Sequence, residues 1–297
     1  MQLENVIEET AVELLRIAVS DLPQAVYDAL SEWLRKETNT TAKSQLEAII
    51  ENVDIARDTR IPMCQDTGVI AFFMEVGENF PVRARLRDVL IKATERATTE
   101  IPIRPNAVDW FEGNTRTNVG YQGQIPWFYW DVVPGDTLTL TAMPKGGGST
   151  NVANLGLLKP GEGMDGIKRF VIDSVARAGA RGCPPYVVGV GIGGGEDMCM
   201  TLAKKALLRG VGNRNKKEEF AKIEQQLLTA INVLGIGTMG LGAGPTALDV
   251  NIEFMARHPA SLPVGIVISC WAERYAKAKI SKEGQVTYIS HKKRENL

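Results

Sequence analysis

The pattern of apolar and polar positions predicts helices over the first sixty residues. Apolar side chains recur there at helical spacing, at Leu3, Ile7, Ala11, Leu14 and Ala18. This period is typical of an amphipathic helix. We expect Asp21 to cap a second helix that ends near Leu34, and Thr40 or Thr41 to cap a third. Residues 1–60 are therefore predicted to form a helical layer.

Beyond residue 60, predicted strands and helices are interspersed. Short apolar, β-prone runs predict strands at residues 69–74, 127–132, 137–142, 186–192, 247–254 and 264–269. Helical periodicity predicts helices at residues 82–99, 163–180, 196–208 and 216–233. A turn at 134–136 joins the second and third strands, and residues 102–126 are irregular. The expected fold is a mixed α/β (α+β) domain over residues 1–297, with a tail at 286–297; two lobes remain open.

Charge and hydropathy exclude several classes of protein. The 297 residues contain 34 Lys and Arg against 35 Asp and Glu, a formal net charge of −1. A nucleic-acid-binding protein would be expected to show an excess of basic residues, and this chain has none. The apolar stretch at 262–271 is too short to span a bilayer, and the N-terminus lacks the pattern of a signal peptide. We therefore expect a cytoplasmic protein with no membrane partner.

Glycine is concentrated in three clusters, at residues 145–149, 189–195 and 235–244. Glycine loops can turn backbone N–H groups toward an anion, or they can serve as tight turns between packed elements. The run from Gly189 to Gly194 fits the spacing of a dinucleotide fingerprint, but residues 209–216 supply neither the strand nor the acidic residue that should follow. A nicotinamide-dependent oxidoreductase is kept as a remote alternative.

The four cysteines are too few for a disulfide scaffold, so we expect thiols or metal ligands. Cys64, Cys183 and Cys270 each lie at a predicted strand end, where functional residues collect. Cys199 lies inside a predicted helix and is interpreted as a buried small hydrophobe. The spacing leaves open both an iron–sulfur cluster and a non-catalytic scaffold whose thiols are merely buried.

Three motifs carry a resemblance to a known family. They are PMCQDTG at residues 62–68, KGGGS at residues 145–149, and HPASLPVG with a following SC at residues 258–270. Together they resemble the class I iron–sulfur fumarate hydratases, a family that includes the two-subunit L(+)-tartrate dehydratases. The similarity runs from about residue 5 to residue 285 and corresponds to the α subunit, or to the N-terminal domain of single-chain members. It implies a hydro-lyase.

The resemblance also implies the site. A [4Fe-4S] cluster would be bound by Cys64, Cys183 and Cys270. Its fourth iron would lack a protein ligand and act as a Lewis acid on substrate. The catalytic residues would be Asp66 and His258. The substrate-binding residues would be Gln65, Arg104, Gly148 and Lys145.

The same resemblance implies a partner and a substrate class. Single-chain members continue into a C-terminal domain that supplies a second acid–base group, whereas only residues 271–297 follow Cys270 here. We therefore expect a β subunit to complete the site, within a heterotetramer built on an α–α dimer. The expected reaction is reversible hydration of fumarate to (S)-malate, because the 145–149 loop resembles fumarases more closely. The alternative C4 dicarboxylate is L(+)-tartrate, dehydrated to oxaloacetate.

Overall fold

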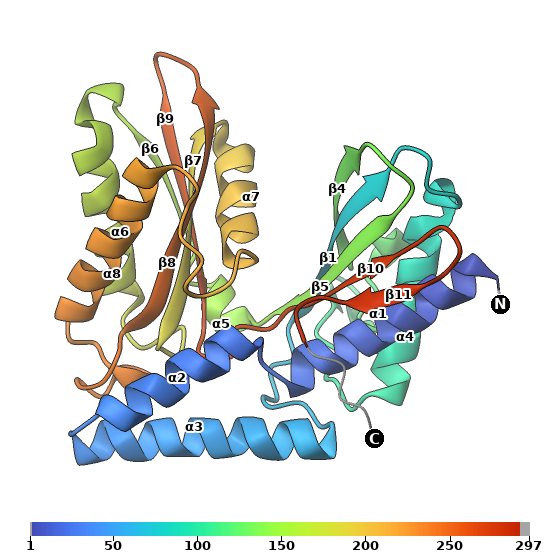
Figure 1. Ribbon diagram of the computed structural model, residues 1–297, viewed down its shortest axis with the longest axis horizontal. Helices are drawn as coiled ribbons and strands as arrows, with labels where there is room; N and C mark the ends of the chain where they lie inside the picture. Colours follow the sequence, from blue (N-terminus) through green and yellow to red (C-terminus); the bar gives the residue numbers. More distant parts are fainter. Residues whose placement is uncertain (1, 292–297) are drawn as a thin grey trace. The chain divides into compact units, whose positions relative to one another are not determined.

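The computed structural model describes residues 2–291 and confirms the mixed α/β class (Figure 1). The chain divides into two compact units. Unit 1 comprises Met1–Gln24, Asn52–Gly147 and Arg274–Leu297, and unit 2 comprises Ala25–Glu51 and Gly148–Glu273. Part of the predicted tail, residues 292–297, lies outside the described residues. Among the described residues, no helix combines the length and apolar character needed to cross a membrane.

The three predicted N-terminal helices are confirmed as α1 (Leu3–Ser20), α2 (Gln24–Lys36) and α3 (Thr40–Thr59). The predicted caps are wrong. The Asn39 side-chain oxygen accepts the N–H groups of Thr41 and Ala42, each at 3.1 Å, so Asn39 caps α3. Asp21 lies three positions before α2 and instead accepts a hydrogen bond from Arg57 Nε at 2.6 Å. Asp21 is too far before Gln24, the first residue of α2, to occupy the cap position directly before the helix.

Unit 1 contains a five-stranded sheet in the order β11-β10-β5-β1-β4. Its strands are β1 (Val69–Gly77), β4 (Trp127–Val133), β5 (Leu138–Lys145), β10 (Ala276–Ile280) and β11 (Val286–Tyr288). The sequence predicts β1, β4 and β5 but not β10 or β11. The turn after β4 joins two strands that do not pair with each other, because β1 lies between them, parallel to β4 and antiparallel to β5. Strand β11 occupies the start of the predicted tail.

Helices α1 and α4 (Leu86–Glu100) cover one face of this sheet. Ile7, Leu14 and Phe72 are completely buried in the core between these helices and the sheet. The apolar residues of α1 recur at helical spacing because they lie on the face that packs against this core. The remaining short elements are η1 (Arg83–Arg85), β2 (Val108–Asp109), β3 (Gly113–Asn114) and η2 (Tyr121–Gly123). The three elements after η1 lie in the region predicted to be irregular, whereas η1 forms the start of the helix predicted at residues 82–99.

Unit 2 is built on a four-stranded sheet in the order β6-β9-β7-β8. Its strands are β6 (Asn154–Leu158), β7 (Tyr186–Gly194), β8 (Ala247–Arg257) and β9 (Leu262–Ser269). Its further helices are α5 (Gly147–Thr150), which begins in unit 1, η3 (Pro160–Glu162), α6 (Gly163–Ala178), α7 (Glu196–Leu207), α8 (Glu218–Val233) and η4 (Thr238–Gly240). Only β7 and β8 are parallel. Helices α6 and α8 pack on one face, and α7 packs on the other (Figure 1).

The glycines of β7 are explained by helix packing. A Cβ atom on Gly189 would lie 2.0 Å from the carbonyl oxygen of Ala203, and one on Gly191 would lie 1.9 Å from that of Cys199. Both carbonyls belong to α7, so the absence of side chains lets this helix lie directly on the sheet. In the run that matches a dinucleotide fingerprint, the space beside Gly189 and Gly191 is therefore occupied by helix α7 of the same chain.

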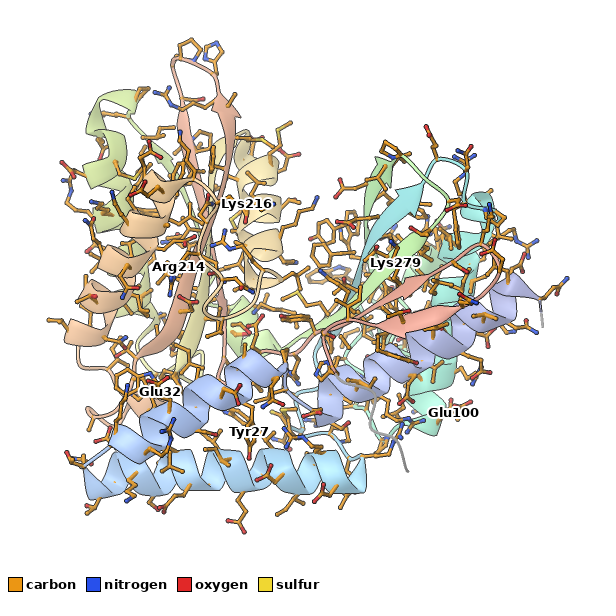
Figure 2. The ribbon with its side chains drawn as sticks, in the orientation of Figure 1. Tyr27, Glu32, Glu100, Arg214, Lys216 and Lys279 are labelled. Atoms are coloured by element: carbon orange, nitrogen blue, oxygen red, sulfur yellow. The ribbon has the colours of Figure 1, made fainter. Side chains whose placement is uncertain are left out.

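The loop between α7 and α8 is fixed to β8 by buried charges. Glu224 and Asp249 are both completely buried. Glu224 accepts a hydrogen bond from Arg209, and Asp249 pairs with Arg214 Nη1 at 2.6 Å (Arg214 is labelled in Figure 2). The N–H of Gly212 also donates to Asp249 Oδ2 at 2.6 Å. Charges buried this deeply need such partners, so the network is a structural element of unit 2.

Candidate functional site

The segment that contains Cys64, Gln65 and Asp66 is tied to unit 1 at both ends. On one side, the Met63 N–H donates to Val19 O at 2.9 Å. On the other, the Thr67 hydroxyl accepts the N–H of Arg104 at 3.0 Å and lies 3.1 Å from its carbonyl oxygen. Cys64 is half-buried, and Gln65 is exposed. The structure therefore brings Arg104 beside the segment, as the predicted site requires.

Asp66 is held through two different oxygens. Its carboxylate Oδ2 accepts the N–H of Gly147 at 2.7 Å. Its carbonyl oxygen accepts a hydrogen bond from Arg274 Nη1 at 2.6 Å. Lys145, the first residue of the KGGGS loop, lies at the end of β5 opposite Val69 and is buried. Unit 1 thus gathers Asp66 and the start of the glycine loop around one turn, together with Arg274, which the sequence analysis missed.

Arg104 differs from the other arginines near this turn because its side chain is exposed. Within residues 2–291, its guanidinium forms no ion pair and no side-chain hydrogen bond. Formation of a surface ion pair therefore does not account for an arginine at this position. An exposed planar cation without an internal acceptor is suited to a carboxylate from outside the chain.

Unit 2 brings two of the predicted cysteines together. Cys183 lies just before β7 and Cys270 just after β9, and these antiparallel strands pair Val187 with Ser269. The Trp271 N–H donates to the carbonyl oxygen of Cys183 at 3.1 Å. Neither cysteine forms a disulfide, and both are half-buried. The two cysteines therefore lie at the same end of the unit 2 sheet.

Tyr186 organises the turn that carries Cys183, and sequence reasoning did not find it. Its hydroxyl donates to Gly179 O at 2.5 Å and accepts the N–H of Gly182 at 3.2 Å. Burial raises the pKa of Tyr186 to about 12, and the nearby Cys183 and Cys270 also raise it. Cys183 has a φ of +58°, a conformation that non-glycine residues seldom adopt. Such strain persists where surrounding contacts impose it, which is common at functional sites.

The third glycine cluster supports the same turn. The Met239 N–H donates to Pro184 O at 2.9 Å. A Cβ on Gly240 would lie 2.3 Å from the Cβ of Ala180. The cluster therefore packs against the chain on both sides of Cys183. Gly148 lies near this turn as well, since a Cβ there would be 3.5 Å from Arg181 O.

Cys199 is distinct from the other three cysteines. It lies on α7 and is completely buried, and its Sγ donates to Glu196 O at 3.3 Å. Burial raises the pKa of its thiol to about 11. The buried hydrophobe expected from the sequence is what the structure contains.

His258 is separated from the two cysteines of unit 2. It lies in the exposed turn between β8 and β9, where its Nδ1 accepts the N–H of Ala260 at 3.1 Å. Cys270 follows the opposite end of β9, a strand of eight residues, which corresponds to about 25 Å. One copy of unit 2 therefore does not bring His258 beside Cys183 and Cys270.

The thiols suit the iron–sulfur cluster that the resemblance implies. Cys64, Cys183 and Cys270 form no disulfides and are half-buried, as ligands accessible to an incoming group would be. Within either unit, no three His, Cys, Asp or Glu side chains of the described residues lie close enough together to hold a metal ion. The three cysteines belong to different units, Cys64 to unit 1 and the other two to unit 2.

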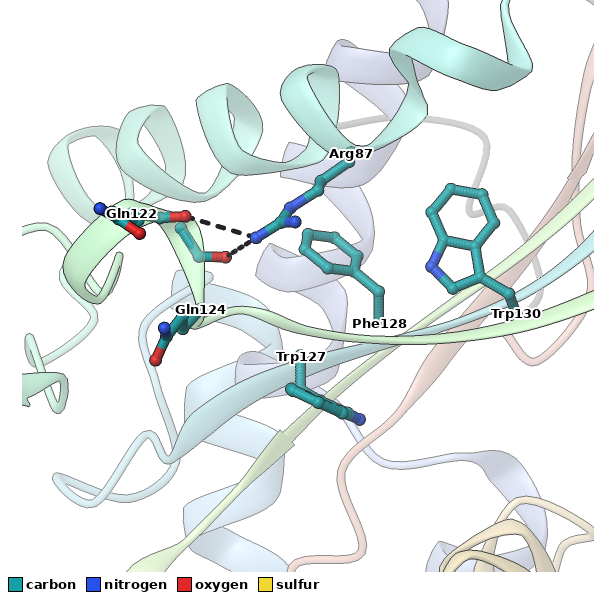
Figure 3. A pocket seen from close by; sticks show the side chains of 7 residues that line it. Arg87, Gln122, Gln124, Trp127, Phe128 and Trp130 are labelled. Atoms are coloured by element: carbon teal, nitrogen blue, oxygen red, sulfur yellow. Dashed lines mark hydrogen bonds between the residues drawn. The ribbon is translucent and has the colours of Figure 1, made fainter.

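A separate pocket in unit 1 contains none of these residues. It has a volume of about 490 Å³ and is lined by Arg87, Gln122, Gly123, Gln124, Trp127, Phe128 and Trp130 (Figure 3). Arg87 donates to Gly123 O at 2.9 Å, and its guanidinium lies 5.8 Å from the centre of the Phe128 ring. With no acidic, cysteine or histidine side chain in its wall, the pocket lacks groups for acid–base or metal chemistry.

Comparison with known proteins identifies the family of the chain. The family profile described as fumarate hydratase (fumerase) matches residues 8–279. A putative L(+)-tartrate dehydratase subunit alpha from Methanocaldococcus jannaschii is 44% identical over 94% of this chain and 99% of its own length. The L(+)-tartrate dehydratase subunit alpha of Escherichia coli strain UTI89 is 35% identical over 98% of this chain and 96% of its own length. The K12 strain's subunit is 34% identical over the same shares.

The chain belongs to the family of class I fumarate hydratases and L(+)-tartrate dehydratase α subunits. It is a hydro-lyase α subunit. The resemblance drawn from the three sequence motifs is confirmed.

Proposed function

We propose that this chain, together with a β subunit, forms an iron–sulfur hydro-lyase that dehydrates L(+)-tartrate to oxaloacetate. The similarity to L(+)-tartrate dehydratase α subunits over nearly the whole of both chains carries this proposal. Their names also support a β subunit as the partner. Tartrate replaces fumarate as the leading substrate because the named relatives outweigh the likeness of the 145–149 loop to fumarases.

The cluster would be held by Cys64 from unit 1 and by Cys183 and Cys270 from unit 2. When bound, it supplies an open iron, a Lewis acid for the hydroxyl oxygen that leaves the substrate. The strained turn at Cys183 and the hydroxyl of Tyr186 fix the position of one thiol. Cys199 takes no part, because its thiol is buried and protonated.

The chain's own polar groups would perform the remaining steps on this side of the substrate. Asp66 gives a proton to the departing hydroxyl in dehydration and takes it back in hydration. The bond from the Gly147 N–H fixes its carboxylate for that task. The exposed guanidinium of Arg104 binds a substrate carboxylate through two N–H groups. Gln65, Lys145 and Gly148 supply further contacts around the same C4 acid.

His258 requires a second copy of the chain for any catalytic role. Its turn and Cys270 lie at opposite ends of β9, so it would reach the site of a neighbouring α subunit in the α–α dimer. The β subunit would provide the other acid–base group and further carboxylate contacts. The site is therefore assembled from several chains, as is common in oligomeric enzymes.

Fumarate and (S)-malate are the second candidate pair. The description of the matching family profile names fumarate hydratase. Each reaction adds or removes one water molecule at a four-carbon dicarboxylate. Arg104 alone does not distinguish the two substrates. A hydrogen bond to the second hydroxyl of tartrate would distinguish tartrate from malate. Malate lacks this hydroxyl, so it would leave the contacting protein group without a partner.

The test is anaerobic purification of this chain with its β subunit, followed by assays with L(+)-tartrate, (S)-malate and fumarate. We expect oxaloacetate to form from L(+)-tartrate with a kcat/KM above that for malate. A preference for malate and fumarate of more than about 10-fold would establish the second candidate. An iron-loaded complex that converts none of the three acids would overturn both.

A further inference from the structure

Arg274 makes an unusual use of a buried charge. It is only 4% exposed, and it is the residue at which the chain re-enters unit 1, four positions after Cys270. Its Nη1 donates to the carbonyl oxygen of Asp66 at 2.6 Å. Its Nε is buried and has no hydrogen-bond partner among the described residues. Burying a guanidinium is costly, and a neutral donor could have satisfied one carbonyl oxygen.

Gly146 brings the guanidinium and the carboxylate close together. A Cβ on Gly146 would lie 2.9 Å from Arg274 Nη2 and 3.0 Å from Asp66 Oδ2. Both groups therefore lie over the same bare Cα atom. The next N–H, from Gly147, binds Asp66 Oδ2 at 2.7 Å. Asp66 is thus held at its carbonyl oxygen by Arg274 and at its carboxylate by the loop.

We infer that Arg274 is a positioning residue for Asp66, and that Gly146 is left without a side chain so that this contact can form. Arg274 itself need not touch substrate. The inference rests on the proposed function only in that Asp66 is the acid–base group. The contact between Arg274, Gly146 and Asp66 is a property of unit 1 alone.

The energetic reason lies in the precision that proton transfer requires. A displacement of about 1 Å in a reacting group can cost on the order of 100-fold in rate. Asp66 directly precedes Thr67, whose hydroxyl is hydrogen-bonded to the Arg104 backbone, and it lies in an irregular segment without strand pairing. A charge-assisted hydrogen bond to its carbonyl oxygen restrains the backbone more firmly than a neutral donor would.

Two variants remove the contact in different ways. Arg274→Lys keeps the charge but replaces the planar guanidinium, so it does not reproduce the same approach to Asp66. Gly146→Ala keeps the arginine but displaces its guanidinium, because the added Cβ would lie 2.9 Å from Arg274 Nη2, the flexible end of that side chain. Arg85→Lys is the matched arginine control, since its side chain is 61% exposed. Gly161→Ala is the matched glycine control, since a Cβ there has no neighbour within 4 Å.

The first measurement is hydrogen–deuterium exchange of the full α chain, followed over peptides covering residues 62–68 and 145–148. We expect both Arg274→Lys and Gly146→Ala to increase exchange in these peptides while Tm and exchange elsewhere stay unchanged. The two controls should match the parent chain. Unchanged exchange in both peptides, or a global loss of protection, would overturn the inference.

The second measurement is steady-state kinetics of the complex with the β subunit, normalised to iron content. We expect kcat to fall by about 10- to 100-fold with KM within about 2-fold, because the substrate still binds but the proton is misplaced. Loss of iron with unchanged kcat per cluster would contradict a positioning role. If the parent complex converts none of the three acids, the proposed function fails, while the exchange experiment still decides whether Arg274 restrains Asp66.

Discussion

The backbone N–H of Trp271 donates to the carbonyl oxygen of Cys183 across 3.1 Å. This bond joins two segments that are almost ninety positions apart in the sequence. It brings the residue after Cys270 directly against Cys183, at one end of the β7–β9 pair. Two of the proposed cluster ligands are therefore neighbours through backbone pairing, before any metal is considered.

Serine substitutions should separate the proposed ligands from the remaining cysteine. Cys64→Ser, Cys183→Ser and Cys270→Ser should each lose most of the cluster after anaerobic reconstitution, because a site with three thiolate ligands depends on every one. Cys199→Ser should keep about four irons and the brown colour. Iron and sulfide analysis with a visible spectrum measures both. A cluster retained in all four variants would contradict the assignment.

The thiol of Cys199 should react slowly, with a rate that rises with pH. Its pKa is raised to about 11 by burial, and only the thiolate is nucleophilic. Below pH 11 the thiol form dominates, so at pH 8 alkylation should be about 100-fold slower than in the unfolded chain, before shielding is counted. Peptide mass spectrometry after iodoacetamide treatment measures this. Equal rates in folded and urea-unfolded protein would show that Cys199 is not buried.

Breaking the buried charge network should destabilise unit 2. Arg209→Met leaves the completely buried carboxylate of Glu224 without its principal cation, and such a loss costs about 3 kcal/mol. Lys222→Met is the control, because its ion pair with Glu218 on α8 is largely exposed. That change should cost less than about 1 kcal/mol. Urea unfolding measures both, and equal losses would contradict the structural role of the network.

His258 offers a test of the α–α dimer. His258→Asn and Cys64→Ser chains should each be inactive when expressed alone with the β subunit. Co-expressed, they should recover about a quarter of parental activity, because half of the dimers are mixed and each has one complete site. Affinity tags on the two chains allow the mixed dimer to be purified and assayed. Full activity of His258→Asn alone would show that the residue serves only its turn.

The local elements could be predicted because their causes are local. The stripe from Leu3 to Ala18 predicted α1, and the continuous apolar run after Val69 predicted β1. The alternation of Ala and Lys in Ala276–Ile280 is a further local strand signal, which the predicted elements did not include. Asn39 was missed as a cap because Asn and Thr compete at adjacent positions, and only the hydrogen bonds distinguish them.

The sequence by itself determined the family and the class of reaction, because these depend on short motifs whose residues are adjacent in the chain. The set of cysteine ligands stays a prediction. Tertiary structure decided what spacing does not encode. It placed β1 between β4 and β5, filled the Gly189–Gly191 run with helix α7, and set His258 at the far end of β9 from Cys270. It also brought Arg274 to Asp66, over two hundred positions away in the chain. Strand pairing and close packing join residues that local sequence cannot relate, so these relationships appear only in the folded chain.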